Sequence, residues 1–287
     1  MPWAAVWCAE FMVNLYPTSD SALESLERIA APSFSGKLSK ERRVKFEESR
    51  DSIEEYLAGI YTEKARQEHK DGREDKEFVD KLRALAIADE GSSTYKIAPA
   101  AVLLGSYLHE TGAAEESTWK ACLKPMMLQG IDLLCDNDLG NDLQAYDVLI
   151  TALIAAGDLD NARAANIEFG MGFTYPEDAD EIAECGYPKE TNFTCDGPCS
   201  TDNYQKPGGY KEIWYCTCCY DTQFCEECIE MTKKGELPLR KCDKDHPFMK
   251  FLPVPEELKE KAVVWNADNP AVEVNREWLE SLRKAWS

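Results

Sequence analysis

Four pairs of candidate metal ligands follow one another in the C-terminal third of the chain, and no other feature constrains its fold as strongly. In chain order the pairs are Cys195-x3-Cys199, Cys216-x2-Cys219, Cys225-x2-Cys228 and Cys242-x3-His246. Two residues between paired cysteines suit a turn that places both sulfur atoms on one metal ion. Structural zinc ions take four ligands, commonly four cysteines or three cysteines and one histidine. The sequence therefore predicts two structural Zn²⁺ ions.

Buried free thiols or redox-active cysteines are the alternative interpretation of this segment. They would not explain why so many thiols gather in a stretch rich in Gly and Pro that has little other core material. The N-terminal residues lack the basic region and the small-residue cleavage site of a secretory signal. In a reducing compartment, clustered CxxC pairs bind metal more often than they form disulfides. We therefore expect an intracellular protein, cytoplasmic or nuclear.

Three residues among the ligands are typical of a known zinc module. Tyr215 is an aromatic residue directly before the third ligand, and Asp221 lies between the fourth ligand and the fifth. Phe224 is an apolar residue directly before the fifth ligand. With these residues the segment 191–255 resembles the ZZ-type zinc finger. Together with its helical N-terminal region, the chain is similar to helical-repeat proteins of filamentous fungi that end in such a module.

The resemblance implies a small cross-braced module with short β-hairpins, in which alternate ligand pairs share a metal ion. One ion would then bind Cys195, Cys199, Cys225 and Cys228, and the other would bind Cys216, Cys219, Cys242 and His246. The sequence alone equally allows sequential pairing. The segment departs from the family because three residues separate its first pair and because Cys242 stands in place of a histidine. In addition, Cys218 is an extra thiol that could compete with Cys216 as a ligand, although the spacing of the family favours Cys216.

The sequence before this module indicates a mainly α-helical fold. From 2 to 173, apolar residues recur at helical spacing and β-branched alternation is almost absent. The first three helices for which the pattern is clear cover 19–29, 39–67 and 78–86. We divide the chain into an N-terminal helical segment (1–90), degenerate helical-hairpin repeats (91–173), a linker (174–190), the ZZ-like zinc module (191–255) and an acidic tail with a short amphipathic helix (256–287).

Two segments of the predicted repeat region share one pattern, which is a helix, a tight turn containing glycine and a second helix. Gly112 marks the first turn and Gly157 the second. The pattern resembles a tetratricopeptide hairpin, although the two glycines are 45 residues apart, whereas that repeat has a period of about 34. An ordinary helical bundle is the alternative.

A stripe of large apolar residues predicts how the C-terminal helix packs. Trp278, Leu279, Leu282 and Trp286 share one face of a predicted helix over 274–286. Such a stripe usually packs against the chain's own domain, and we expect that here. Docking of this helix onto a partner is the less favoured alternative.

The charge of the chain excludes several classes of partner. Its 53 acidic and 32 basic residues give a formal net charge of −21. Nucleic acids and anionic membranes are bound mainly by Lys and Arg, so neither is expected as a partner. The most apolar stretch, 1–15, is interrupted by Glu10 and is shorter than the roughly 18–20 apolar residues that a membrane span needs. We expect this stretch to form a buried first helix, and the acidity favours a basic partner.

The ligand count argues for an interaction protein rather than an enzyme. Catalytic zinc keeps one position open, whereas eight ligands for two ions leave none. The chain has no HExxH motif, no Walker-type loop and no Ser/His/Asp arrangement. The ZZ resemblance implies recognition of protein N-termini by acidic residues, and Asp196 and Asp221 match two such positions. Gln223 replaces a third acidic residue, and Asp196 could instead only stabilise the turn after Cys195.

Two other interpretations remain beside this one. A RING-like cross-brace module acting as a ubiquitin-ligase component would also interleave two zinc sites, but RING modules usually have a histidine among the middle ligands. No histidine lies between Cys199 and Cys242. The chain could also be the C-terminal part of a longer protein, because its first residues enter a predicted helix without a lead-in.

Overall fold

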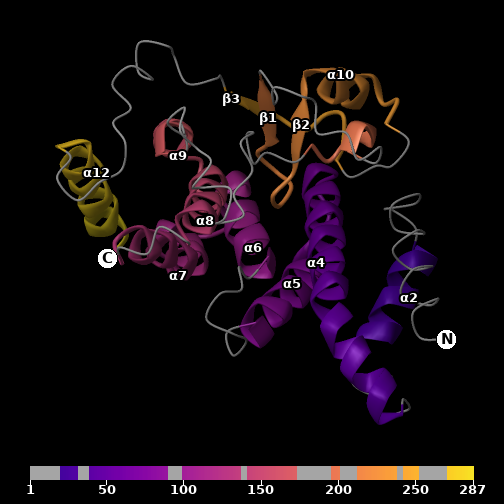
Figure 1. The fold of residues 1–287 in the computed structure, drawn as a ribbon. Coiled ribbons are helices and arrows are strands. Elements are labelled where there is room, and N and C mark those ends of the chain that lie inside the picture. The colour runs from indigo at the N-terminus through magenta and orange to yellow at the C-terminus, as the bar shows by residue number, and fades with distance from the viewer. Residues whose placement is uncertain are drawn as a thin grey trace. The chain divides into compact units, whose positions relative to one another are not determined.

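Helices make up most of the described structure, and one small antiparallel sheet accompanies them (Figure 1). The computed structural model describes residues 20–31, 39–89, 99–136, 141–172, 195–200, 212–237, 242–251 and 270–287. The predicted mainly α-helical fold with a small β-containing cysteine-rich region is confirmed. The expected first helix in 1–15, the linker 174–190 and the acidic stretch 256–269 lie outside the described residues.

The described residues form two compact units, one within Met1–Cys122 and the other within Leu123–Leu237 and Cys242–Ser287. Among its described residues, the first unit contains four complete helices, α2 (Asp20–Ala30), α4 (Lys40–Lys70), α5 (Lys76–Asp89) and α6 (Pro99–Thr111). The predicted helices over 19–29, 39–67 and 78–86 correspond to α2, α4 and α5. Among the described residues, no helix has the length and apolar character that a membrane crossing requires.

The core of the first unit forms where α4, α5 and α6 pack on one another (Figure 1). Its largest fully buried side chains are Leu26, Ile53, Leu82 and Tyr107. Polar contacts hold α2 at the edge of this core. The Tyr61 hydroxyl donates to Glu27 at 2.9 Å, and Lys81 pairs with the same carboxylate at 3.0 Å. Helix α2 therefore joins its neighbours through a half-buried ion pair as well as through its apolar face.

Helix α7 (Glu116–Leu134) crosses the boundary between the units, and α8 (Asp142–Ala155) and α9 (Leu159–Gly172) belong to the second unit. Helices α8 and α9 pack as a hairpin. Gly157 has a φ of 70°, and its N–H donates to the carbonyl oxygen of Ile154. Glycine adopts this left-handed conformation without strain. The turn between the two helices therefore lies at Gly157, as the sequence predicts. The assignment to a tetratricopeptide family stays a prediction.

The C-terminal helix α12 (Pro270–Trp286) packs against the second unit, as its apolar stripe predicts. Leu279 and Leu282 are buried, and the indole N–H of Trp278 donates to Asn161 of α9 at 2.9 Å. Arg283 also pairs with Asp132 of α7 at 2.5 Å. Apolar burial and these two polar contacts together fix α12 on its own chain.

A three-stranded antiparallel sheet organises the cysteine-rich region. Strand β1 (Ile213–Cys216) lies between β2 (Gln223–Cys225) and β3 (Phe248–Phe251), and α10 (Glu226–Lys234) lies against β1 and β2. One face of the sheet contributes Phe224 to a buried core that also holds Ile229 of α10 and most of the cysteines. On the other face, Tyr215 packs edge-on against Phe251, with their ring centroids 4.8 Å apart.

Candidate metal centres

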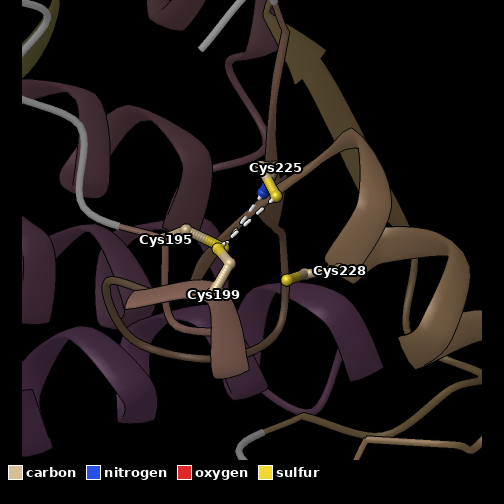
Figure 2. Close-up of side chains that lie close together, drawn as sticks. All are labelled: Cys195, Cys199, Cys225 and Cys228. Carbon is tan, nitrogen blue, oxygen red and sulfur yellow. Dashed lines mark hydrogen bonds between the residues drawn. The ribbon is translucent and has the colours of Figure 1, made fainter. Parts of the chain in front are cut away.

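The first candidate metal centre brings together the cysteines of the first and third predicted pairs (Figure 2). The ligand atoms of Cys195, Cys199, Cys225 and Cys228 all lie within 4.8 Å of one another. The sulfur atoms of Cys199 and Cys225 are 3.7 Å apart. Three of the four side chains are buried, and Cys199 is partly exposed. Four convergent sulfur atoms of this kind form a Cys₄ donor set.

The second centre brings together Cys216, Cys219, Cys242 and His246, again within 4.8 Å. The Cys242 sulfur lies 3.4 Å from that of Cys216 and 3.7 Å from that of Cys219. The Nδ1 atom of His246 is 3.5, 3.3 and 3.4 Å from the sulfurs of Cys216, Cys219 and Cys242. His246 therefore presents Nδ1 to three sulfurs at once, which is a Cys₃His donor set.

These separations fit tetrahedral zinc. With Zn–S distances of about 2.3 Å and a Zn–N distance of about 2.0–2.1 Å, the tetrahedral angle places neighbouring sulfurs about 3.8 Å apart and sulfur and nitrogen about 3.6 Å apart. The observed values of 3.4–3.7 Å between sulfurs and 3.3–3.5 Å from sulfur to nitrogen lie slightly below these edges. The two groups are therefore consistent with two four-coordinate metal ions.

The pairing of ligands is interleaved along the chain. The first pair joins the third and the second joins the fourth, so sequential pairing, which the sequence alone equally allowed, is not what the structure has. Cys218 belongs to neither group, although it is buried. Its N–H donates to the Cys216 sulfur at 3.3 Å, as does the N–H of Cys219 at 3.2 Å. The structure thus places Cys216, rather than Cys218, among the ligands.

Local structure orients the ligands of the first group. Cys225 ends β2 and is the N-cap of α10, and Cys228 lies in the first turn of that helix. The positive end of a helix favours thiolates at these positions. The N–H of Cys225 also donates to the Cys195 sulfur at 3.2 Å. Gly235 ends the helix with a φ of 72°, so α10 is a short, well-bounded support for two ligands.

Gly197 is a residue that the sequence analysis did not select and that the first group requires. A Cβ atom at this position would lie 2.3 Å from the sulfur of Cys228 and 2.5 Å from its Cβ. The Gly197 N–H also donates to the Cys195 sulfur at 3.4 Å. The signal was present in the sequence as a glycine inside the first ligand pair, because close backbone approach is one reason for a glycine in such a turn.

In a group of four close thiols, each thiolate makes it harder for the next thiol to ionise, unless a cation binds between them. The hydrogen bond from the Cys195 thiol lowers the pKa of Cys225 to about 5, whereas burial raises the pKa of Cys228 to about 12. In the second group, the hydrogen bond with Cys216 raises the pKa of Cys242 to about 12. Metal ligands must be thiolates, so a dication displaces these protons and supplies the missing positive charge. Both donor sets, Cys₄ and Cys₃His, are ones that bind Zn²⁺.

The two acidic residues selected from the sequence lie next to this framework. The Asp196 carboxylate accepts the Gln223 N–H at 2.9 Å, and the Asp196 N–H donates to the Gln223 carbonyl at 2.8 Å. Asp196 thus ties the first ligand turn to β2. Asp221 is exposed, in the turn that leads into β2, and has a φ of 38°. The charges of both carboxylates act on Tyr215 of β1.

Two further polar residues near Tyr215 were not selected from the sequence. Burial, and then the charges of Asp147, Asp221 and Asp196, raise the pKa of Tyr215 well above its ordinary value. Asp147 comes from α8, where mostly apolar residues surround it. Gln223 lies directly opposite Tyr215 in the sheet, and its side-chain oxygen is buried without a hydrogen bond.

Comparison of the chain with protein-family models, curated proteins and solved structures found no match in any of the three. The two four-ligand groups therefore rest on the geometry of this chain alone. The ZZ assignment stays a resemblance carried by the residues that surround the ligands.

Proposed function

We propose that this chain is a non-enzymatic adaptor, in which two structural zinc ions hold a ZZ-like module that binds a basic peptide or the N-terminus of a protein. The interleaved Cys₄ and Cys₃His groups carry this proposal, because each brings together four donors that could hold one metal ion. A site with four protein ligands leaves no position for a substrate or an activated water molecule. Thiolate ligands also fit a reducing compartment, the cytoplasm or nucleus.

Asp196 and Asp221 are the residues that we propose for recognition. A free α-ammonium group and an Arg side chain are both cationic and can donate several charge-assisted hydrogen bonds to carboxylates. The net charge of −21 favours encounter with such a partner. Asp221 is exposed and therefore accessible, and Asp196 is held in place by its bonds to the Gln223 backbone. A carboxylate fixed on a rigid turn loses little entropy when it binds.

The test measures binding of fluorescent peptides that carry either a free or an acetylated N-terminus. Asp196→Asn is preferred to Ala because the amide oxygen can still accept the Gln223 N–H. Together with Asp221→Asn it should weaken binding of the free-amine or basic peptides. Asp245→Asn, which changes an exposed carboxylate elsewhere in the module, is the matched control. Zinc stoichiometry is measured for every variant, and unchanged binding curves for both test variants would refute the proposal.

A ubiquitin chain-formation assay distinguishes the ubiquitin-ligase alternative from the adaptor. Interleaved zinc pairs support a RING-like module as much as a ZZ-like one, but no histidine lies between Cys199 and Cys242. Chain formation with a panel of ubiquitin-conjugating enzymes would establish the ligase. The adaptor proposal expects no chain formation and expects binding of peptides instead.

A further inference from the structure

The sheet of the cysteine-rich region has a second buried face, which lies opposite the core that contains Phe224. Tyr215, Met249 and Phe251 of this face are each 3% exposed. Tyr215 is the direct antiparallel partner of Met249, and directly opposed side chains lie on one face of a sheet. Helix α10 and the cysteines pack with Phe224 on the opposite face. Another part of the chain must therefore cover the Tyr215 face.

Helix α9 packs against β3, the strand that carries Met249 and Phe251. Strand β3 is at one edge of the sheet, and both elements belong to the second compact unit. Along β3 the residues alternate between partly exposed and buried, and Met249 and Phe251 are the buried ones. A contact of this kind lets the sheet and the helical hairpin share buried apolar surface, so that each loses stability without the other.

The second metal group lies where β3 joins the sheet. Its ligand Cys216 ends β1 and is the direct partner of Phe248, the first residue of β3. Its ligand His246 comes two residues before Phe248. Between them, the carbonyl oxygen of Pro247 accepts the N–H of Thr217 at 3.1 Å and its hydroxyl at 3.2 Å. A metal ion bound to Cys216 and His246 would therefore hold the start of β3 against the end of β1.

Helix α9 in turn holds the C-terminal helix α12. The indole N–H of Trp278 donates to Asn161 of α9 at 2.9 Å, and Leu279 and Leu282 of α12 are buried. The contacts thus form a series within one compact unit, from the second metal group to β3, from β3 to α9, and from α9 to α12. A change at the metal group has a continuous path of packed elements to α12.

We propose that metal binding by the second group controls the packing of α9 and α12, so that loss of this metal loosens the helical hairpin and exposes the apolar face of α12. The free energy of binding a structural metal is also folding free energy. Elements that share a buried surface with the metal-dependent sheet should therefore open more often when the metal is absent. This inference rests on the zinc ions of the proposed function but not on peptide binding, so either can fail without the other.

Hydrogen–deuterium exchange measured by mass spectrometry on the full chain tests this coupling. His246→Ala should hold one zinc ion by native mass spectrometry, and the amides of α9 and α12 should exchange at least about tenfold faster than in wild type. Exposure of one large apolar side chain is enough for that factor. Helices α4 and α5 of the first unit are the internal reference and should keep their exchange rates. Wild-type protection of α9 in the one-zinc protein, or an equal loss in α4 and α5, would overturn the proposal.

A reciprocal measurement leaves all eight ligands intact and decides the question if His246→Ala does not fold. Coupling between two parts of a protein acts equally in both directions, so a weaker α9 should release zinc more easily. Ala165 of α9 and Ala65 of α4 are both fully buried helical alanines, and glycine weakens a helix at either position. With a colorimetric chelator, Ala165→Gly should release one of its two zinc ions up to about fivefold faster than wild type, whereas the matched control Ala65→Gly should not. Equal zinc release by the two variants would show that α9 and the second metal group are not coupled.

Discussion

Substitution of Gly197 tests the geometry of the first metal group most directly. The added Cβ of Gly197→Ala would lie 2.3 Å from the Cys228 sulfur. Non-bonded atoms of this size approach to about 3.5 Å, so the sulfur or the turn must move by about 1.2 Å. Zinc–ligand distances are held to within about 0.2 Å, and the shift is therefore about six times what the site tolerates. We expect Gly197→Ala to hold one zinc ion at chelator concentrations that leave two on the wild type.

Native mass spectrometry and colorimetric zinc release measure this outcome. Gly235→Ala is the matched control, since Gly235 has a φ of 72° and its Cβ would meet only the Lys244 side chain, at 3.7 Å. This control carries a backbone strain of about 1–2 kcal/mol but no clash with a ligand. It should therefore unfold at a lower temperature and still bind two zinc ions. Two zinc ions on Gly197→Ala, with wild-type resistance to chelator, would refute the geometric argument.

Four further substitutions test other parts of the structure. Cys216→Ser should lose one zinc ion and Cys218→Ser none, as counted by native mass spectrometry; the reverse result would exchange the two thiols as ligands. Burial raises the pKa of Asp147 in the folded protein. Below the ordinary Asp pKa, Asp147 is protonated in both states and does not affect the free energy of unfolding. As the pH rises from the ordinary Asp pKa to the folded pKa, the unfolded chain ionises first and the free energy of unfolding falls. Asp147→Asn should therefore be more stable than wild type at pH 7 in urea titrations, and the two should converge below the ordinary Asp pKa; equal stability at both pH values would contradict this. Trp278→Phe loses the bond to Asn161 and should be less stable by about 1 kcal/mol, whereas an unchanged urea midpoint would show that this bond contributes nothing.

The metal ligands were predictable because their signal is local. Paired cysteines two or three residues apart indicate a metal whatever the rest of the chain does, and all eight predicted ligands converge in the structure. The interleaved pairing was not derivable in this way, since it depends on β1, β2 and β3 meeting in one sheet. Only the resemblance to the ZZ finger implied it. The resemblance likewise favoured Cys216 over Cys218 by its spacing, and the backbone of the turn agrees, because it directs two N–H groups at the Cys216 sulfur.

Residues whose role depends on packing between distant elements were missed. Asp147 reads in the sequence as one polar residue in an apolar helix, and nothing local connects it with Tyr215. In the sequence, Gln223 only replaces an acidic residue of the ZZ pattern, because its burial follows from the register of β1 and β2. The helix positions were predicted well because the periodicity and the turn glycines that define them lie within short segments and need no information from distant elements.

The interleaving of the two groups also fixes the order in which they can form on a growing chain. The first group is complete when Cys228 has been synthesised, whereas the second must wait for His246, 18 residues later. Chains emerge from the N-terminus at about 5–20 residues per second, so a module with only its first metal exists for about a second or more during synthesis. During that interval Cys216 and Cys219 already lie inside the loop that the first metal closes. Two of the four ligands of the second group therefore lie in a chain segment whose ends are already fixed, and these two lose less conformational entropy when the second metal binds.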